Sequence, residues 1–173
     1  MWRALWLLLV LAATLKAAGG LVAGIHYAEI SHKASHDSGI SNGRSAWGPG
    51  FMIGYDAESY RMIVTRSTPD FKSPQRATLT TLSAHLIDHE DSYLRGFIGL
   101  SMGKLDYRHA AQSSSSEIDL YGVELGLILL DDRYERTQME LGYRYLKTYG
   151  SMPEGLSMGR LSALYVGFNF HFF

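Results

Sequence analysis

The sequence contains no cysteine. This absence excludes a disulfide framework, a thiolate metal site and a cysteine nucleophile. It also excludes a lipoprotein, because the lipid of that class is attached to an N-terminal cysteine.

Charge of one sign and long apolar runs are missing as well. The chain has 16 basic and 17 acidic residues, so it lacks the basic excess that nucleic-acid binding usually needs. Beyond the N-terminus no segment has 18 consecutive apolar residues, so no helical membrane span is predicted. At 173 residues the chain has room for one domain.

What the sequence does contain is glycine and tyrosine, with 18 and 11 residues against only 4 prolines. Glycine within strands permits a tightly curved sheet, and tyrosine suits a boundary that is apolar on one side and wet on the other. The mean hydropathy is near zero, as expected where lipid-facing and lumen-facing residues alternate.

The first 19 residues have the three parts of a secretory signal peptide. Arg3 supplies a positive start, an apolar run of about a dozen residues follows, and the small residues Ala17 to Gly19 offer a cleavage zone. A membrane anchor is the alternative, but the run is short of the roughly 20 residues that a span needs. We therefore expect a cleaved signal peptide over 1–19 and one domain over 20–173.

The remaining chain alternates between apolar and polar residues. In 137–145, Leu141 and its alternate neighbours are apolar, whereas the other face carries Glu140 and Arg144. A face of this polarity cannot meet hydrocarbon, so it must line a polar interior or contact water. This period of two predicts β-strands.

Eight such segments follow one another and predict an all-β fold. The expected strands are residues 21–31, 47–56, 60–66, 80–86, 93–108, 118–130, 134–146 and 161–173. The connections alternate between four long polar ones (32–46, 67–76, 109–117 and 147–155) and three short ones (56–58, 88–91 and 130–133). This pattern is typical of an eight-stranded antiparallel up-and-down transmembrane β-barrel, with both chain ends on the short-turn, periplasmic side.

The chain resembles the superfamily of small eight-stranded outer-membrane barrels, which includes the OmpA-like and OmpX-like barrels and the opacity proteins. The glycine-rich strand 96–107 and the terminal stretch 166–173 carry the resemblance. It implies a cell outer-membrane location in a Gram-negative bacterium, and a last strand that the barrel-assembly machinery reads through alternating apolar residues. The residues that fit this signal are Val166, Phe168, Phe170 and Phe172. Phe173 extends one residue beyond the usual end.

The inward positions predict a polar network inside the barrel. Its expected members are Arg61, Arg95, Glu124, Arg136, Glu140 and Arg144. Such charges must be paired, since unpaired burial is costly. A conducting path is the alternative to a plug, but eight strands leave an interior just wide enough for side chains. A plugged lumen is therefore the prediction.

Several residues could suggest catalysis or metal binding. His32, His36, Asp37 and Ser38 gather in the first long connection, and His109 adjoins the serine run 113–116. A triad needs its members held within hydrogen-bond reach, which loop residues do not provide. The His-x-Ser-Asn pattern of outer-membrane deacylases is absent, since no histidine precedes Ser41-Asn42 at the required position. His32 and His36 have the spacing of helical metal ligands but lie in an expected loop. We expect no catalytic, cofactor or metal site.

The sequence thus predicts a non-enzymatic outer-membrane barrel with a structural or surface-interaction role through four extracellular loops. Its expected partners are outer-membrane lipid and lipopolysaccharide, the barrel-assembly machinery during insertion, and host or other extracellular ligands at the loops, with no nucleic acid. Two alternatives stay open: a lipid A deacylase or acyltransferase of the outer membrane, and a soluble periplasmic lipocalin-like barrel with its apolar faces inward.

Overall fold

The alternating segments all form strands in the computed structural model, which describes residues 19–35, 41–57, 59–70, 75–88, 93–109, 115–130, 136–149 and 157–172. The strands are β1 (Gly19–Ser35), β2 (Ser41–Ala57), β3 (Tyr60–Ser67), β4 (Gln75–Ile87), β5 (Leu94–His109), β6 (Ser115–Leu130), β7 (Thr137–Tyr149) and β8 (Ser157–Phe172). Among these residues, no helix is long and apolar enough to cross a membrane.

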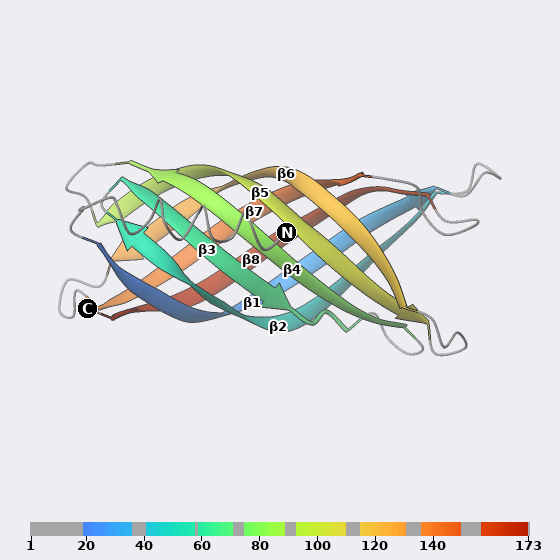
Figure 1. Ribbon diagram of the computed structural model, residues 1–173, viewed down its shortest axis with the longest axis horizontal. Coiled ribbons are helices and arrows are strands. Elements are labelled where there is room, and N and C mark those ends of the chain that lie inside the picture. The colour runs from blue at the N-terminus through green and yellow to red at the C-terminus, as the bar shows by residue number, and fades with distance from the viewer. Residues whose placement is uncertain are drawn as a thin grey trace, which may run out of the picture.

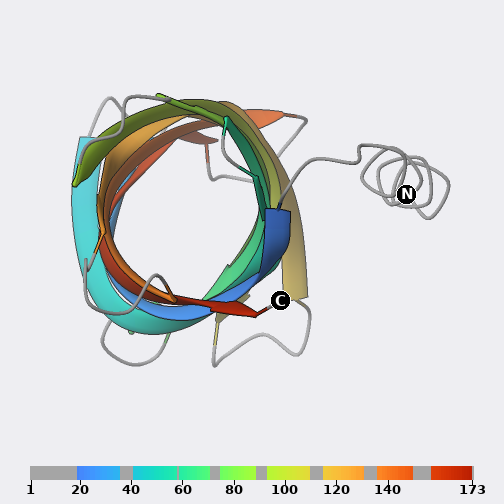
Figure 2. The same ribbon diagram turned by 90° about the vertical axis from the view of Figure 1, so that its left-hand side faces the viewer.

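The strands close into a barrel. Each strand pairs antiparallel with the next along the chain, and β8 pairs with β1 from Leu21↔Phe172 onward, so no sheet edge is left at the junction. Figure 1 shows the tilted strands from the side, and Figure 2 shows the closed ring from the end at which β1 starts and β8 finishes. The predicted fold class, an eight-stranded antiparallel up-and-down transmembrane β-barrel, is confirmed.

The two faces of the wall have opposite polarity. Phe168 and Leu141 point outward and are 47% and 41% exposed, whereas Glu140 and Arg144 point inward and are 0% and 3% exposed. On the other strands, too, large apolar and aromatic side chains point outward. A lipocalin-like barrel has the reverse arrangement, so this alternative is wrong.

The strands are longer than the sequence predicted. Residues 32–46 were expected to form a loop, yet β1 continues to Ser35 and β2 begins at Ser41, with paired backbones throughout. The other three expected loops are shortened too, because β3 includes Ser67, β4 begins at Gln75, β5 ends at His109, β6 begins at Ser115 and β7 ends at Tyr149. Backbone hydrogen bonds hold a strand together whatever its side chains, so polarity alone does not end it. The N-terminal end of β1 lies at Gly19, one residue before the predicted start of the domain.

Two glycines make room for aromatic side chains inside the barrel. Gly142 lies opposite Tyr165 in the β7–β8 register, and a Cβ on this glycine would meet the tyrosine ring. Gly126 lies opposite Phe97 in the β5–β6 register and stands in the same relation to its ring. The absence of a side chain at each glycine lets a ring lie against the inner wall. These glycines therefore position Tyr165 and Phe97 within the lumen.

Candidate functional site

The interior of the barrel near the short connections holds a set of polar side chains that we call the ionic network. Every member is buried, and together they come from β2, β3, β6, β7 and β8. The members are Asp56, Arg61, Glu124, Gln138, Glu140, Arg144, Tyr165 and Asn169. Strand alternation sends these residues inward, and closure of the barrel brings them together.

Glu124 and Arg144 form the first ion pair of the network. They lie opposite each other in the β6–β7 register. Arg144 donates from Nε to Oε2 and from Nη2 to Oε1 of the carboxylate, both at 2.9 Å. The hydroxyls of Ser83 and Ser101 donate to Oε2 at 2.8 and 2.7 Å. This bidentate geometry, with further donors, is what a buried carboxylate needs to remain stable as an ion.

Arg61 is the centre of the second group of contacts. Its Nε and Nη2 atoms donate to Oδ2 of Asp56 at 3.0 and 2.6 Å. Its Nη1 atom donates to Oε2 of Glu140, which lies across the lumen on β7. Nη2 also donates to the amide oxygen of Gln138 at 2.9 Å. One guanidinium thus joins β2, β3 and β7.

Tyr165 connects the two groups. Its hydroxyl oxygen lies 2.6 Å from Oε1 of Glu124 and 2.6 Å from Oε1 of Glu140, so its single proton is shared between the two carboxylates. The Arg144 guanidinium carbon lies 5.5 Å from the centre of its ring. Asn169 donates to Oε2 of Glu140 at 2.9 Å. The network is therefore continuous from Asp56 to Arg144.

Toward the long connections the interior changes character and becomes apolar. We call these inward side chains the apolar cap, and they come from every strand except β3. They are Ala28, Ile30, Ala46, Ala77, Leu79, Leu105, Ile118, Leu120, Leu146, Leu161 and Ala163, all buried. The ionic network and the apolar cap together fill the two halves of the lumen with different chemistry.

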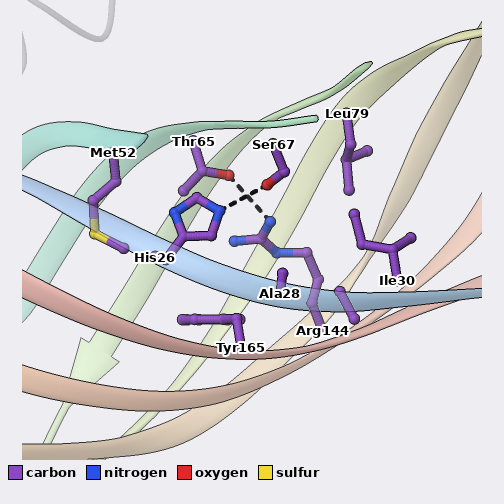
Figure 3. A pocket seen from close by; sticks show the side chains of 10 residues that line it. His26, Ala28, Ile30, Met52, Thr65, Ser67, Leu79, Arg144 and Tyr165 are labelled. Atoms are coloured by element: carbon purple, nitrogen blue, oxygen red, sulfur yellow. Dashed lines mark hydrogen bonds between the residues drawn. The ribbon is translucent and has the colours of Figure 1, made fainter. Parts of the chain in front are cut away.

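A small cavity lies where the two halves meet (Figure 3). His26, Thr65, Ser67 and Arg144 line it on the polar side, and residues of the apolar cap line it on the other. His26 Nε2 and Ser67 Oγ are 2.7 Å apart, and Arg144 Nη1 donates to Thr65 Oγ1 at 3.1 Å. The space holds about one water molecule, which excludes a substrate.

The His26–Ser67 contact is the nearest approach to a hydrolytic arrangement among the described side chains. A triad also needs a group that orients the histidine through Nδ1. The His26 Nδ1 atom has no hydrogen-bond partner in the structure, and both side chains are buried. In the described part of the chain, no three histidine or acidic residues gather as metal ligands. The arrangement gives no route to acyl transfer.

The structure brings together four of the six predicted interior residues, namely those in the ionic network. Arg95 is only half-buried near the short-connection end, and its Nε atom has no hydrogen-bond partner. Arg136 was expected inside, but its side chain is exposed in the turn before β7. The correction has a simple cause: β7 begins at Thr137, so the strand alternation does not extend back to Arg136.

The remaining sequence candidates lie at the periphery. His36, Asp37, Ser38 and the serine run up to 114 are outside the described residues. His32 lies in β1 and His109 ends β5. The predicted assembly residues Val166, Phe168, Phe170 and Phe172 all face outward along β8, and Phe173 is outside the described residues.

Sequence reasoning missed three parts of the site. The bridging role of Tyr165 was not predicted, and neither was the pairing of Asp56 with Arg61. The strict alternation does signal that both point inward. The apolar cap was missed entirely, because an inward leucine on an alternating strand looks the same in sequence as an outward one. Only the register shows which level of the lumen it occupies.

The structural comparisons agree with this architecture. Neisserial surface protein A is 20% identical, with a TM-score of 0.70 over 90% of this chain and 99% of that one. OprH from P. aeruginosa is 21% identical, with a TM-score of 0.56 over 88% and 99%. Ail, the attachment invasion locus protein of Yersinia pestis, is 16% identical, with a TM-score of 0.53 over 88% and 99%. No family model matches the sequence, and no curated protein matches it.

These likenesses span nearly the whole of each solved chain at low identity, so they establish architecture. They agree with the closed eight-stranded barrel of this chain. The chain has the fold of the small eight-stranded outer-membrane β-barrels.

Proposed function

We propose that this chain is a non-enzymatic outer-membrane protein of a Gram-negative bacterium. Its barrel is an anchor with a closed lumen, and its role is structural or lies in surface interaction through the long connections. The signal-peptide pattern of residues 1–19 supports export. The long connections face the outside in this proposal, and the short connections and both ends of the chain face the periplasm.

One observation carries the proposal: exposed apolar side chains form a band around the wall, while the ionic network is enclosed. On β6 the outward apolar residues run from Tyr121 to Leu129, and on β8 from Leu164 to Phe172. Runs of this length match the 9–11 residues that a tilted strand needs to cross a bilayer. A soluble protein rarely exposes so large an apolar surface. Contiguous apolar patches beyond a few hundred Å² usually mark a site of contact with another protein or with a membrane.

The packing of the interior supports a closed lumen. The buried carboxylates bond to arginines and hydroxyls of the same network, so they are not arranged along an open water path. The apolar cap adds a layer of buried side chains that cannot solvate an ion. A non-enzymatic role is supported by the same satisfaction of polar groups, since a catalytic base must reach its substrate.

A pair of variants tests the membrane location. Leu125 is outward and 53% exposed, and Leu125→Arg places a charge in hydrocarbon at a cost of about 2–4 kcal/mol. We expect less heat-modifiable barrel in the outer-membrane fraction. The control Thr78→Arg adds the same charge on the outward face of β4, beyond the apolar residues and opposite Asp106 in the register, and should behave as wild type. Equal yields for both variants, or a wild-type product in the soluble periplasm, would contradict the proposal.

Three further measurements test the role. Planar bilayers containing the purified barrel should show no large, steady openings. Lipid A mass spectra should be unchanged by expression, since a loss or gain of an acyl chain would favour the enzyme alternative. Replacing the long connections one at a time by short glycine-serine turns should lower cell adhesion or serum survival for at least one replacement. Full activity in every replacement would overturn the surface-interaction role.

A further inference from the structure

The two contacts of the Tyr165 hydroxyl need more protons than the hydroxyl has. Its oxygen lies 2.6 Å from Oε1 of Glu124 and 2.6 Å from Oε1 of Glu140. Oxygen atoms about 2.5–2.7 Å apart are typical of strong hydrogen bonds, each of which contains a proton. A hydroxyl has a single proton, so it fills only one of the two contacts at any moment. Without a second proton, the other contact brings two oxygen lone pairs together.

The charges of the ionic network do not balance if every carboxyl group is ionised. The network has three carboxyl groups, those of Asp56, Glu124 and Glu140, and two guanidinium groups, those of Arg61 and Arg144. All five side chains are buried, and both glutamates are 0% exposed. Three carboxylates would leave one net negative charge in a closed interior, where an uncompensated charge is costly. A carboxyl group that keeps its proton removes this charge.

The hydrogen bonds divide the charged groups into two matched ion pairs. Arg61 donates twice to Asp56, at 3.0 and 2.6 Å. Arg144 donates twice to Glu124, both times at 2.9 Å. Two serine hydroxyls also donate to Glu124, at 2.8 and 2.7 Å, which suits an ionised carboxylate. The third carboxyl group, that of Glu140, therefore has no guanidinium of its own.

Glu140 has the surroundings of a neutral carboxyl group. Its Oε2 atom accepts from Arg61 Nη1 and from Asn169 Nδ2. Its Oε1 atom bonds to the Tyr165 hydroxyl, which is its one hydrogen-bond partner among the described residues. A proton on this Oε1 is donated to the Tyr165 oxygen, and the Tyr165 proton is then donated to Glu124. Each of the two short contacts thereby gains its own proton.

Histidines also face the network, but a proton on a histidine would not fill the tyrosine contact. His85 Nε2 on β4 lies 3.3 Å from Oε2 of Glu124, and His171 Nε2 on β8 lies 3.6 Å from Oδ2 of Asp56. Neither contact involves Oε1 of Glu140. The other titratable groups beside the network are His26 on β1, whose ring centre lies 6.0 Å from that of Tyr165, and the half-buried Arg95 on β5.

We propose that the ionic network is a proton-binding site, in which one proton is held on Oε1 of Glu140 and bonded to Tyr165. The network is then neutral, with two guanidinium groups against two carboxylates. The proton comes from solvent when the barrel folds and returns to solvent when it unfolds, because a glutamate in water is ionised at neutral pH. The folded chain thus holds one proton more than the unfolded chain, so a rise in pH favours unfolding.

Infrared spectroscopy of the purified barrel in lipid vesicles detects this proton. A protonated carboxyl group has a C=O stretching band that is separate from the bands of carboxylates and amides. We expect the band at neutral pH in wild type and its loss in Glu140→Gln, whose amide keeps the shape of the neutral group and can donate to Tyr165. The control Glu117→Gln removes an outward carboxylate paired with Lys104 and should keep the band. A wild-type spectrum without the band, or a Glu140→Gln spectrum with it, overturns the proposal.

Denaturant unfolding in the same vesicles, at pH values above the titration range of histidine, is the second measurement. Relative to Glu140→Gln, the wild-type equilibrium constant for unfolding should rise about tenfold for each pH unit, because only wild type releases this proton. At neutral pH, Glu124→Gln should unfold at lower denaturant than Glu140→Gln, since it removes the charge that faces Arg144. Parallel pH profiles of wild type and Glu140→Gln would contradict the proposal, and a larger loss in Glu140→Gln than in Glu124→Gln would refute the assignment to Glu140.

Discussion

The two halves of the lumen are both closed, but by opposite chemistry. Near the short connections, Arg61 and Arg144 hold three carboxyl groups through directional bonds. Toward the long connections, the apolar cap fills the same cross-section with leucine, isoleucine and alanine. Ionic contacts demand one geometry, whereas apolar side chains tolerate repacking. The comparison indicates that the ionic half fixes the relative positions of strands on opposite sides of the lumen. The apolar half excludes water from the lumen.

The largest expected effect comes from breaking the ionic half. Arg144→Met leaves Glu124 buried without its cation, and such a loss costs about 3–5 kcal/mol. The change should appear in denaturant unfolding of the barrel in lipid vesicles. The double variant Arg144→Met/Glu124→Leu removes both charges and leaves Ser83 and Ser101, whose hydroxyl oxygens lie 2.8 Å apart, to bond each other. It should lose less than the single variant, and an equal or greater loss would show that the pair is not the source of the effect.

A smaller effect is expected in the apolar half. Leu79 is 1% exposed in the apolar cap, and Leu79→Ala should cost about 3 kcal/mol through lost contacts and the cavity left behind. The same truncation at outward Leu127, which is 41% exposed, is the control, because lipid tails can fill the space there. Vesicle unfolding should rank Leu79→Ala well below Leu127→Ala in stability. A reversed ranking would mean that the cap does not pack as a core.

The smallest effect concerns the glycine that makes room for Tyr165. A methyl group at Gly142 would meet the buried tyrosine ring, and overpacking of this kind costs about 1–3 kcal/mol. At Gly159 a Cβ has nothing within 4 Å, so Gly159→Ala should change stability by less than about 0.5 kcal/mol. Unfolding midpoints of the two variants check this. Identical midpoints would show that the ring can move aside, and that the position of Tyr165 is not held by the wall.

Strand alternation predicted much of this molecule from residues alone. Glu140 and Leu141 are neighbours in sequence, and their assignment to opposite faces follows from the pleat of any strand. The same rule placed Arg61, Glu124 and Arg144 inside. It failed at Arg136, which lies just before β7, and at residues 32–46, because polarity does not mark where backbone pairing stops. The face to which each side chain points was predictable, whereas the residues at which the strands begin and end were not.

The partners within the lumen could not be predicted in the same way. Arg61 and Glu140 are 79 residues apart in sequence, and Tyr165 is 41 residues from Glu124. Their contacts depend on the register of eight strands and on where the ring closes. A shift of one residue in any pairing would turn these side chains to the other face. The apolar cap depends on register in the same way, because its members share a level only in the closed barrel.

The amino-acid sequence by itself determined that this chain forms eight antiparallel strands, each with one apolar and one largely polar face. These properties follow from the local alternation of apolar and polar residues. The tertiary structure alone decided that the interior is divided into an ionic half and an apolar half. The reason is that closure fixes distances between residues far apart in sequence, which no local pattern contains.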